Sequence, residues 1–223
     1  MCFEDWNELF SLGKIADVAI IATMDKQHYA PVLKACDLKY DVLLEKPVST
    51  VPSECKEIAL CAEKNNVKVI VCTVLRYTPL FMTLKKLIDE GRIGKVMSIN
   101  HEECVGNVHQ SHSFVRGNWG NEGRSSCMLL QKSCHDADIL QWLIGKKCKK
   151  IQSFGKLTHF KAENAPEGAP ERCSDGCPHE SSCPYSTLKL YLNSKDDHWF
   201  RPAAAHSVER ENFFPTNEDV MKA

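Results

Sequence analysis

Two residues in this sequence have types and surroundings that suit chemistry on a small molecule, and the first is Lys46. It follows an apolar run that ends in Glu45, and it precedes Pro47. An ammonium group at the end of a buried strand can orient a substrate oxygen and stabilise charge on a developing alkoxide, and burial can lower its pKa. The alternative is a lysine that only flanks a turn before proline.

The second residue is His135, which lies in a helical pattern. Gln131, Lys132, Asp138 and Ile139 share its face at spacings of three and four residues. A histidine that titrates near neutrality can accept a hydroxyl proton as hydride leaves the same carbon, and can return it in reduction. Lys132 would add a cation beside the substrate. A histidine that satisfies polar contacts in a core is the alternative.

Several residues near predicted strand ends are candidates for binding a dinucleotide cofactor. Hydrogen-bond donors at strand ends and helix starts commonly bind the phosphate and ribose groups of such cofactors. The predicted cofactor-binding residues are therefore Ala22, Thr23, His28, Glu45 and Lys46. Arg76, through its fork of donors, and Trp119, through stacking, could contact a nicotinamide ring. Both could equally be structural.

A cluster of thiols lies in a segment rich in Pro and Glu. Three cysteines and a histidine within eleven residues could form a tetrahedral zinc site, with Cys173, Cys177, His179 and Cys183 as ligands. The spacing is not the C-x-x-C pair of a zinc ribbon, so free thiols or a local redox pair are alternatives. Most of the other cysteines sit in apolar patterns, as buried residues of a reducing compartment do.

The first part of the chain predicts alternating strands and helices. Strands are expected at 17–22, 41–45 and 67–72, with helices at 27–38 and 53–65. The apolar runs suit a doubly wound parallel sheet with right-handed crossovers. No glycine-rich phosphate turn precedes the first strand. The pattern therefore predicts the C-terminal part of a Rossmann-like domain over residues 1–73, shortened at its amino end.

A different pattern follows from residue 74 to residue 223. An amphipathic helix ends at Gly91, and later segments predict a strand at 94–103, a long loop at 105–126, a helix at 128–143 and a strand at 149–160. The overall fold class is therefore α/β. The second domain is expected to be an incomplete α+β unit with an open, mainly antiparallel sheet and a Cys-rich insertion at about 161–187.

Composition limits the classes of partner. The 28 basic and 29 acidic residues give a net charge of −1, so we expect neither nucleic acid nor a membrane as a partner. No apolar run approaches the roughly 18 to 20 residues of a membrane span. The acidic start of the chain is unlike a signal peptide. A cytoplasmic location is the expectation.

The order of several motifs resembles the glucose-fructose oxidoreductase / inositol dehydrogenase (Gfo/Idh/MocA) family. The motifs are A-D-V-A-I-I-A-T at 16–23, L-L-E-K-P at 43–47, L-R-Y-T-P at 75–79, G-R-I-G-K-V at 91–96 and S-C-H-D-A-D at 133–138. The resemblance implies hydride transfer between NAD or NADP and a sugar, cyclitol or related carbonyl compound. It also implies a homo-oligomer interface on the C-terminal sheet and catalytic roles for Lys46 and His135. Many members carry aspartate where this chain has Gln131.

Two other functions remain open at this point. The absence of a glycine loop favours a non-catalytic homologue that associates with a full-length partner, because pyrophosphate binding would lose its main anchor. The retention of Lys46 and His135 argues against it. NAD-assisted glycoside cleavage, which some relatives perform, is the other alternative, and free sugar without net cofactor reduction would reveal it.

Overall fold

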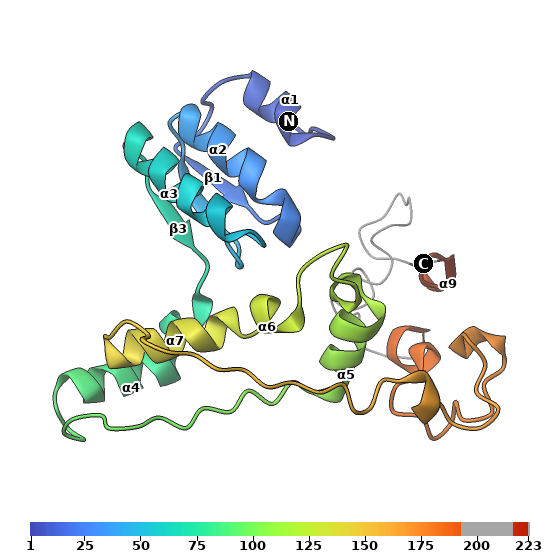
Figure 1. Ribbon diagram of the computed structural model, residues 1–223. Coiled ribbons are helices and arrows are strands. Elements are labelled where there is room, and N and C mark those ends of the chain that lie inside the picture. The colour runs from blue at the N-terminus through green and yellow to red at the C-terminus, as the bar shows by residue number, and fades with distance from the viewer. Residues whose placement is uncertain (193–215, 223) are drawn as a thin grey trace. The chain divides into compact units, whose positions relative to one another are not determined.

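The protein divides into two compact units in a computed structural model that describes residues 1–192 and 216–222 (Figure 1). The first unit contains residues 1–103 and 121–150, and the second contains residues 104–120 and residues from 151 onward. The elements of the first unit are α1 (Trp6–Ser11), β1 (Val18–Ile21), η1 (Asp25–Gln27), α2 (Tyr29–Asp37), β2 (Asp41–Leu44), α3 (Pro52–Asn65), β3 (Val69–Val71), η2 (Val74–Tyr77), α4 (Pro79–Asp89), α6 (Met128–Gln131) and α7 (Cys134–Ile144). Those of the second are α5 (Asn107–His109), η3 (Gln110–Arg116), η4 (Asn118–Gly120), η5 (Ala162–Asn164), η6 (Cys173–Asp175), η7 (Leu188–Leu192) and α9 (Asn217–Lys222).

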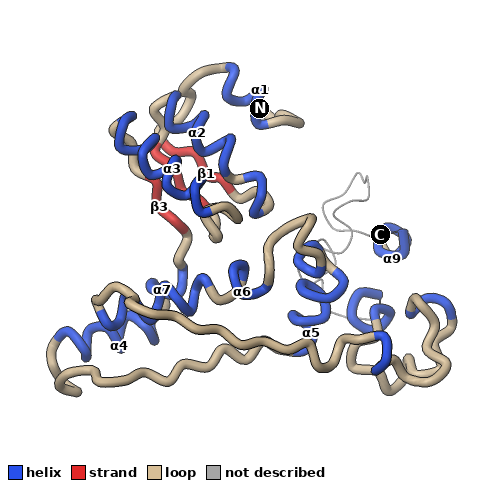
Figure 2. The backbone as a smooth tube through the Cα atoms, in the orientation of Figure 1, coloured by secondary structure: helices blue, strands red, loops and turns tan. Residues whose placement is uncertain are grey.

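A parallel sheet forms the centre of the first part of the chain (Figure 2). Its strand order is β1-β2-β3, and Ile20, Leu43 and Ile70 lie in register across it. The strands and the intervening helices α2 and α3 fall within two residues of their predicted ranges. The predicted α/β class is confirmed.

The hydrophobic core lies between this sheet and helices α2 and α3. Val32 on α2 and Leu44 on β2 have no exposed surface, and Ile58 on α3 is 3% exposed. Helix α3 begins at Pro52, where no N–H is needed, and ends before Asn66, whose φ of 53° supplies the left-handed cap. The core therefore fixes the carboxyl ends of β1 and β2, from which the candidate site residues extend.

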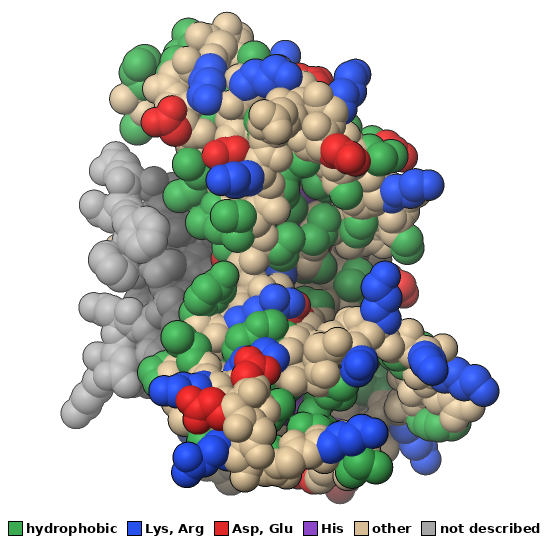
Figure 3. Space-filling model, turned by 90° about the vertical axis from the view of Figure 1, so that its left-hand side faces the viewer, with side chains coloured by type: hydrophobic (Ala, Val, Ile, Leu, Met, Phe, Trp, Pro, Cys, Tyr) green, Lys and Arg blue, Asp and Glu red, His purple; other side chains and the backbone are tan. Residues whose placement is uncertain are grey.

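The other face of the sheet leaves apolar side chains exposed in the described structure. Ile20 is 71% exposed and Ile70 is 53% exposed, although parallel sheets are normally buried on both faces. Figure 3 shows one side of the protein, where hydrophobic side chains lie at the surface among lysines, arginines and acidic residues. Charges of both signs are interspersed on that side, so it carries no large patch of a single sign.

The predicted strands at 94–103 and 149–160 are wrong for this structure. Neither segment belongs to a strand, and the described residues contain one sheet, of three strands. Met97 is 82% exposed and Phe154 is 93% exposed. Alternating apolar and polar residues are compatible with a strand that has one exposed face. A strand forms, however, only where a neighbouring strand completes its hydrogen bonds.

Two other segments also differ from their predicted form. The stretch at 105–126 contains α5, the π-helical turn η3 and η4 rather than an unbroken loop. The single helix predicted at 128–143 is two helices, α6 and α7, with Lys132 and Ser133 between them. Within residues 1–192 and 216–222, no helix is long and apolar enough to cross a membrane.

Candidate active site

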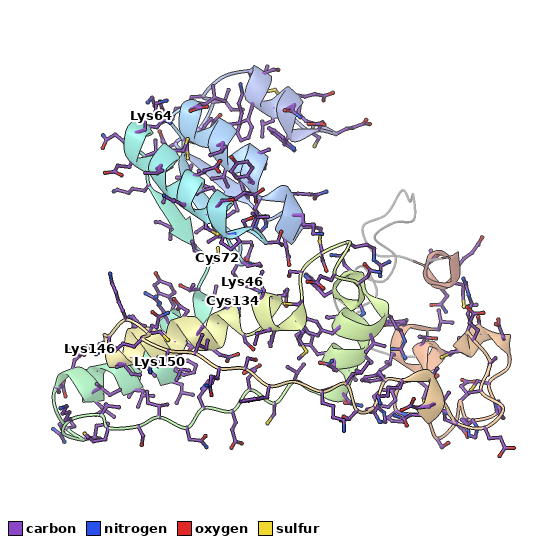
Figure 4. All side chains as sticks on the ribbon, viewed as in Figure 1. Lys46, Lys64, Cys72, Cys134, Lys146 and Lys150 are labelled. Carbon is purple, nitrogen blue, oxygen red and sulfur yellow. The ribbon has the colours of Figure 1, made fainter. Side chains whose placement is uncertain are left out.

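Lys46 lies directly beyond the carboxyl end of β2 and is partly buried. Its Nζ donates a hydrogen bond to the main-chain carbonyl of Gln131 over 2.9 Å. Its backbone N–H donates to Oε2 of Glu45 at 3.2 Å, and the Lys46-Pro47 peptide bond is cis. Burial lowers the pKa of Lys46, although nearby Cys134, Asp25 and Glu45 oppose the effect. The ammonium is thus held by a main-chain acceptor. Figure 4 labels Lys46 and, near it, Cys134.

The break between α6 and α7 makes that acceptor available. In a continuous helix the carbonyl of Gln131 would accept the N–H of His135, but this N–H instead donates to the carbonyl of Lys132 at 3.3 Å. The carbonyl of Gln131 accepts Lys46 Nζ and, at 3.4 Å, Sγ of Cys134. Gln131 therefore contacts Lys46 through its main chain.

His135 lies in the first turn of α7 and is partly buried. Burial lowers its pKa, and the positive charges of Lys46 and Lys132 lower it further. Its Nδ1 atom is buried and has no hydrogen-bond partner in the described part of the protein. The ring is therefore neutral near pH 7, with a polar atom that still needs a partner.

Lys132 is placed beside His135 but is already paired. Its Nζ lies 3.3 Å from Oε1 of Glu103, and Nε2 of His101 lies 2.7 Å from Oδ1 of Asp136. These contacts join the extended segment before residue 104 to the start of α7. The sequence analysis predicted neither the Lys132–Glu103 contact nor the His101–Asp136 contact. The alternating pattern of the segment that carries His101 and Glu103 does not indicate which helix this segment contacts.

Ala22 and Thr23 follow β1 and are exposed at the same edge of the sheet as Glu45. The backbone N–H of Glu45 donates to the carbonyl of Ile21 at 2.9 Å, so the two strand ends are directly joined. The Oγ1 of Thr23 donates to the carbonyl of Gln27 at 3.2 Å. The sheet thus brings together these residues of the predicted cofactor-binding set.

His28 has a structural position rather than an open one. Its side chain is 1% exposed, with Nδ1 2.8 Å from the carbonyl oxygen of Pro47 and Nε2 3.0 Å from that of Thr23. Both ring nitrogens are occupied by the main chain. His28 therefore holds the turn after Lys46 against the end of β1.

Arg76 is also occupied within the protein. Its Nε donates to Oδ2 of Asp138 at 2.7 Å and its Nη2 donates to Oδ1. Trp119 belongs to the second unit, where its ring lies 6.2 Å from that of Phe114. Arg76 is thus engaged by Asp138, and a cofactor role for either residue stays a prediction.

The four residues of the predicted zinc site are not gathered as metal ligands in the described structure, and the site stays a prediction. No group of three or more His, Cys, Asp or Glu side chains in residues 1–192 and 216–222 is placed to hold a metal ion. The ring Nε2 of His179 lies 2.8 Å from the carbonyl oxygen of Glu167, and Sγ of Cys183 accepts the N–H of Tyr185 at 3.4 Å. All twelve cysteines are free thiols.

Asp25 and Ser126 were absent from the prediction, although both are buried beside this region. The Oγ of Ser126 donates to Oδ2 of Asp25, which joins η1 to the segment before α6. Lys26 reinforces the link by donating to the carbonyl oxygens of Glu122 and Gly123. Bonds between residues about a hundred positions apart leave no periodic signal in the sequence.

Family models match both parts of the chain. Residues 1–73 match the model described as "Oxidoreductase family, NAD-binding Rossmann fold", and residues 81–172 match the GFO/IDH/MocA C-terminal domain. The parallel sheet and these matches place the chain in the class of proteins with an NAD-binding Rossmann fold. The chain belongs to the Gfo/Idh/MocA oxidoreductase family, as its motifs predicted.

Curated relatives extend the comparison. The Bacillus subtilis protein YteT is 26% identical over 200 residues, which are 86% of this chain and 46% of YteT. Inositol 2-dehydrogenase of Salmonella typhimurium is 22% identical over 153 residues, covering 68% of this chain and 42% of that enzyme. The chain spans less than half the length of these relatives.

Solved structures show the same fold. Scyllo-inositol dehydrogenase from Lactobacillus casei, solved with NAD(H) and scyllo-inositol, aligns with a TM-score of 0.54 at 22% identity over 65% of this chain and 42% of that one. The WlbA dehydrogenase from Bordetella pertussis, solved with NADH and UDP-GlcNAcA, aligns with a TM-score of 0.53 at 22% identity, covering 64% and 40%. Both relatives bind small molecules together with NAD(H).

Proposed function

We propose that this chain carries the catalytic centre of an NAD(H)-dependent oxidoreductase that acts on a sugar, cyclitol or related hydroxy or carbonyl compound. The observation that supports it most is the environment of His135. In the described residues its buried Nδ1 has no hydrogen-bond partner, its pKa is lowered, and it lies within electrostatic reach of the Lys46 ammonium. A substrate hydroxyl or carbonyl oxygen is the kind of group that both side chains would meet.

The roles of the two residues follow from their chemistry. His135, neutral near pH 7, accepts the hydroxyl proton during oxidation and returns it during reduction. Lys46 orients the substrate oxygen and stabilises its negative charge, because it is held by the Gln131 carbonyl and partly desolvated. Lys132, which is paired with Glu103, adds a second positive charge near His135.

The residues at the sheet edge suit one end of the cofactor. NAD(H), when bound, supplies or accepts the hydride. The exposed hydroxyl of Thr23, the main chain at Ala22, and Glu45 with Lys46 lie at the carboxyl ends of parallel strands, where open α/β sheets bind ligands. We assign the nicotinamide and ribose end to these residues, and the phosphate end to groups outside this set.

Calorimetry with NAD(H) and NADP(H) tests the proposal. We expect NAD(H) to bind to the full chain and the affinity to fall about tenfold or more in Lys46→Ala, the result of losing a charged contact. Lys64→Ala, which removes an exposed lysine from α3, is the matched control and should leave binding unchanged. Absence of binding to a folded sample would overturn the proposal and favour a non-catalytic association partner.

A substrate screen separates net oxidation from other chemistry. Under this proposal, a sugar or cyclitol yields NADH in equal amount to the carbonyl product, with loss of turnover in His135→Asn. Release of free sugar from a glycoside without net NADH would instead identify cofactor-assisted glycoside cleavage.

A further inference from the structure

The contact between Arg76 and Asp138 joins η2, which follows the parallel sheet, to α7, which carries His135. Arg76 lies in η2, five residues beyond Val71 at the end of β3, and Asp138 lies in α7, one turn after His135. The guanidinium donates through two nitrogens to the two carboxylate oxygens of Asp138. This forked geometry restricts orientation as well as distance, which a single ionic contact does not do.

The pair is partly buried, Asp138 more than Arg76. The side chains of Arg76 and Asp138 are 37% and 17% exposed. The Cζ atom of Arg76 also lies 5.9 Å from the ring centroid of Trp142, one turn further along α7. Partial burial makes such a pair less sensitive to screening by salt than an exposed one.

Along the chain, His135 lies between two residues, Gln131 and Asp138, that bond to segments following the strands of the sheet. Four residues before it, the carbonyl of Gln131 accepts Lys46 Nζ, and three residues after it, Asp138 accepts Arg76. His135 and Asp138, three residues apart in α7, lie on one side of that helix. The helix break after Gln131 separates the first turn of α7 from α6. The contact of Asp136 with His101 holds that turn, and the bond of Asp138 to Arg76 adds a second restraint with a defined orientation.

We propose that Arg76 and Asp138 are a positioning pair that sets the separation between Lys46 and His135, an inference that rests on the proposed function. Neither residue touches the reacting atoms. The pair acts through α7, because an ion pair with fixed orientation at one turn fixes the imidazole at the preceding turn. Without it, the first turn of α7 can rotate away from the Lys46 ammonium.

A double-mutant cycle tests whether the distance between Lys46 and His135 is fixed. Its readout is the change that Lys46→Met causes in the pKa of His135. The pKa of His135 is followed by NMR of the ring C–H groups, with His135→Gln used to assign the resonance. In the wild-type background, Lys46→Met raises the pKa of His135, because the Lys46 charge lowers it. We expect this rise to fall to less than half in the Asp138→Asn background, since the distance between the two groups becomes variable.

Glu90→Gln provides the matched control. It breaks the exposed contact of Lys86 with Glu90 on α4, where the charged atoms are 3.8 Å apart. The effect of Lys46→Met on His135 should remain at its full size in this background. Arg76→Lys keeps the charge but loses the fork, so it should produce an intermediate loss, and joint Arg76→Asp with Asp138→Arg should restore part of the coupling.

The outcomes are separable from those of the proposed function. An undiminished rise in both folded Asp138→Asn and folded Arg76→Lys, verified by circular dichroism, overturns the positioning role. These measurements use the full chain without cofactor, whereas calorimetry with NAD(H) tests the function. If the chain did not bind NAD(H) but Asp138→Asn still reduced the effect of Lys46→Met on the pKa of His135, the proposed function would be rejected. The role of Arg76 and Asp138 in positioning His135 would still hold.

Discussion

The ammonium of Lys46 donates to the main-chain carbonyl of Gln131, 85 positions later in the chain, with 2.9 Å between Nζ and O. The acceptor is available because α6 ends at Gln131 and α7 begins at Cys134. A main-chain acceptor is present whatever side chain occupies the position. Replacement of an acidic residue by Gln131 therefore does not by itself remove the contact that holds Lys46.

The titration of Lys46 is the first prediction. Competitive acetylation followed by mass spectrometry should give Lys46 a labelling midpoint below the ordinary lysine value of 10.5, because burial lowers its pKa. Exposed Lys64, Lys146 and Lys150 serve as internal references for reagent concentration (Figure 4). Gln131→Met should leave the midpoint in place, since it keeps the carbonyl. A midpoint at or above the ordinary value would contradict the observed environment.

The second prediction concerns His112, which is 8% exposed and whose Nδ1 lies 2.8 Å from the hydroxyl oxygen of Tyr191. Burial lowers the pKa of His112 from 6.5 to about 4, with further lowering from His109 and Arg116. Between these values the unfolded chain binds more protons than the folded chain, so stability is lost as the pH falls from 6.5 towards 4.

Urea unfolding measures this dependence. From about pH 7 to about pH 4.5 the wild type should lose roughly 2–3 kcal/mol more stability than His112→Gln, which has no titrating group. The other histidines are common to both proteins and cancel in the difference. Equal losses in the two proteins would show that His112 is not kept neutral by the fold.

The third prediction uses a glycine at the end of η3. A Cβ at Gly117 would lie 2.5 Å from the carbonyl oxygen of His112, a main-chain atom that cannot move alone. Gly117→Ala should therefore destabilise the protein by about 1–3 kcal/mol in urea unfolding. Gly106→Ala is the control, because a Cβ there meets nothing within 4 Å. Equal effects of the two substitutions would argue against the close approach at Gly117.

Cys173 supplies the fourth prediction. Burial acts to raise the pKa of its thiol, but hydrogen bonds from Thr187 and the charge of Arg116 outweigh it, so the pKa is lowered. Thr187→Val should raise the pKa and slow alkylation by iodoacetamide near neutral pH several-fold, because the thiolate is the nucleophile. Cys177, in the same segment, gives the reference rate by mass spectrometry. An unchanged ratio of the two rates would remove Thr187 as the cause.

The elements of the parallel sheet were predictable because their signals are local. Continuous apolar runs mark β1 and β2, and Pro52 and Asn66 bound α3. Each feature depends on neighbours within a few positions. The family and the α/β class followed from the order of these elements and their motifs, which the matching family models confirm.

The segments at 94–103 and 149–160 show where this reasoning stops. Their alternation suits a strand with one exposed face, yet neither is paired in the described structure. A strand requires hydrogen bonds from a second segment, and the sequence of one segment does not contain its partner. Helix signals carry no such requirement, since helical hydrogen bonds are made within four residues.

By itself, the sequence determined which groups with useful chemistry are present and which strand or helix carries Lys46 and His135. The tertiary structure decided what surrounds them. It buried His28 between two carbonyls, committed Arg76 to Asp138, and gave Lys46 a main-chain acceptor from Gln131. The physical reason is that burial and hydrogen bonding between distant residues are properties of packing, and packing has no period along the chain.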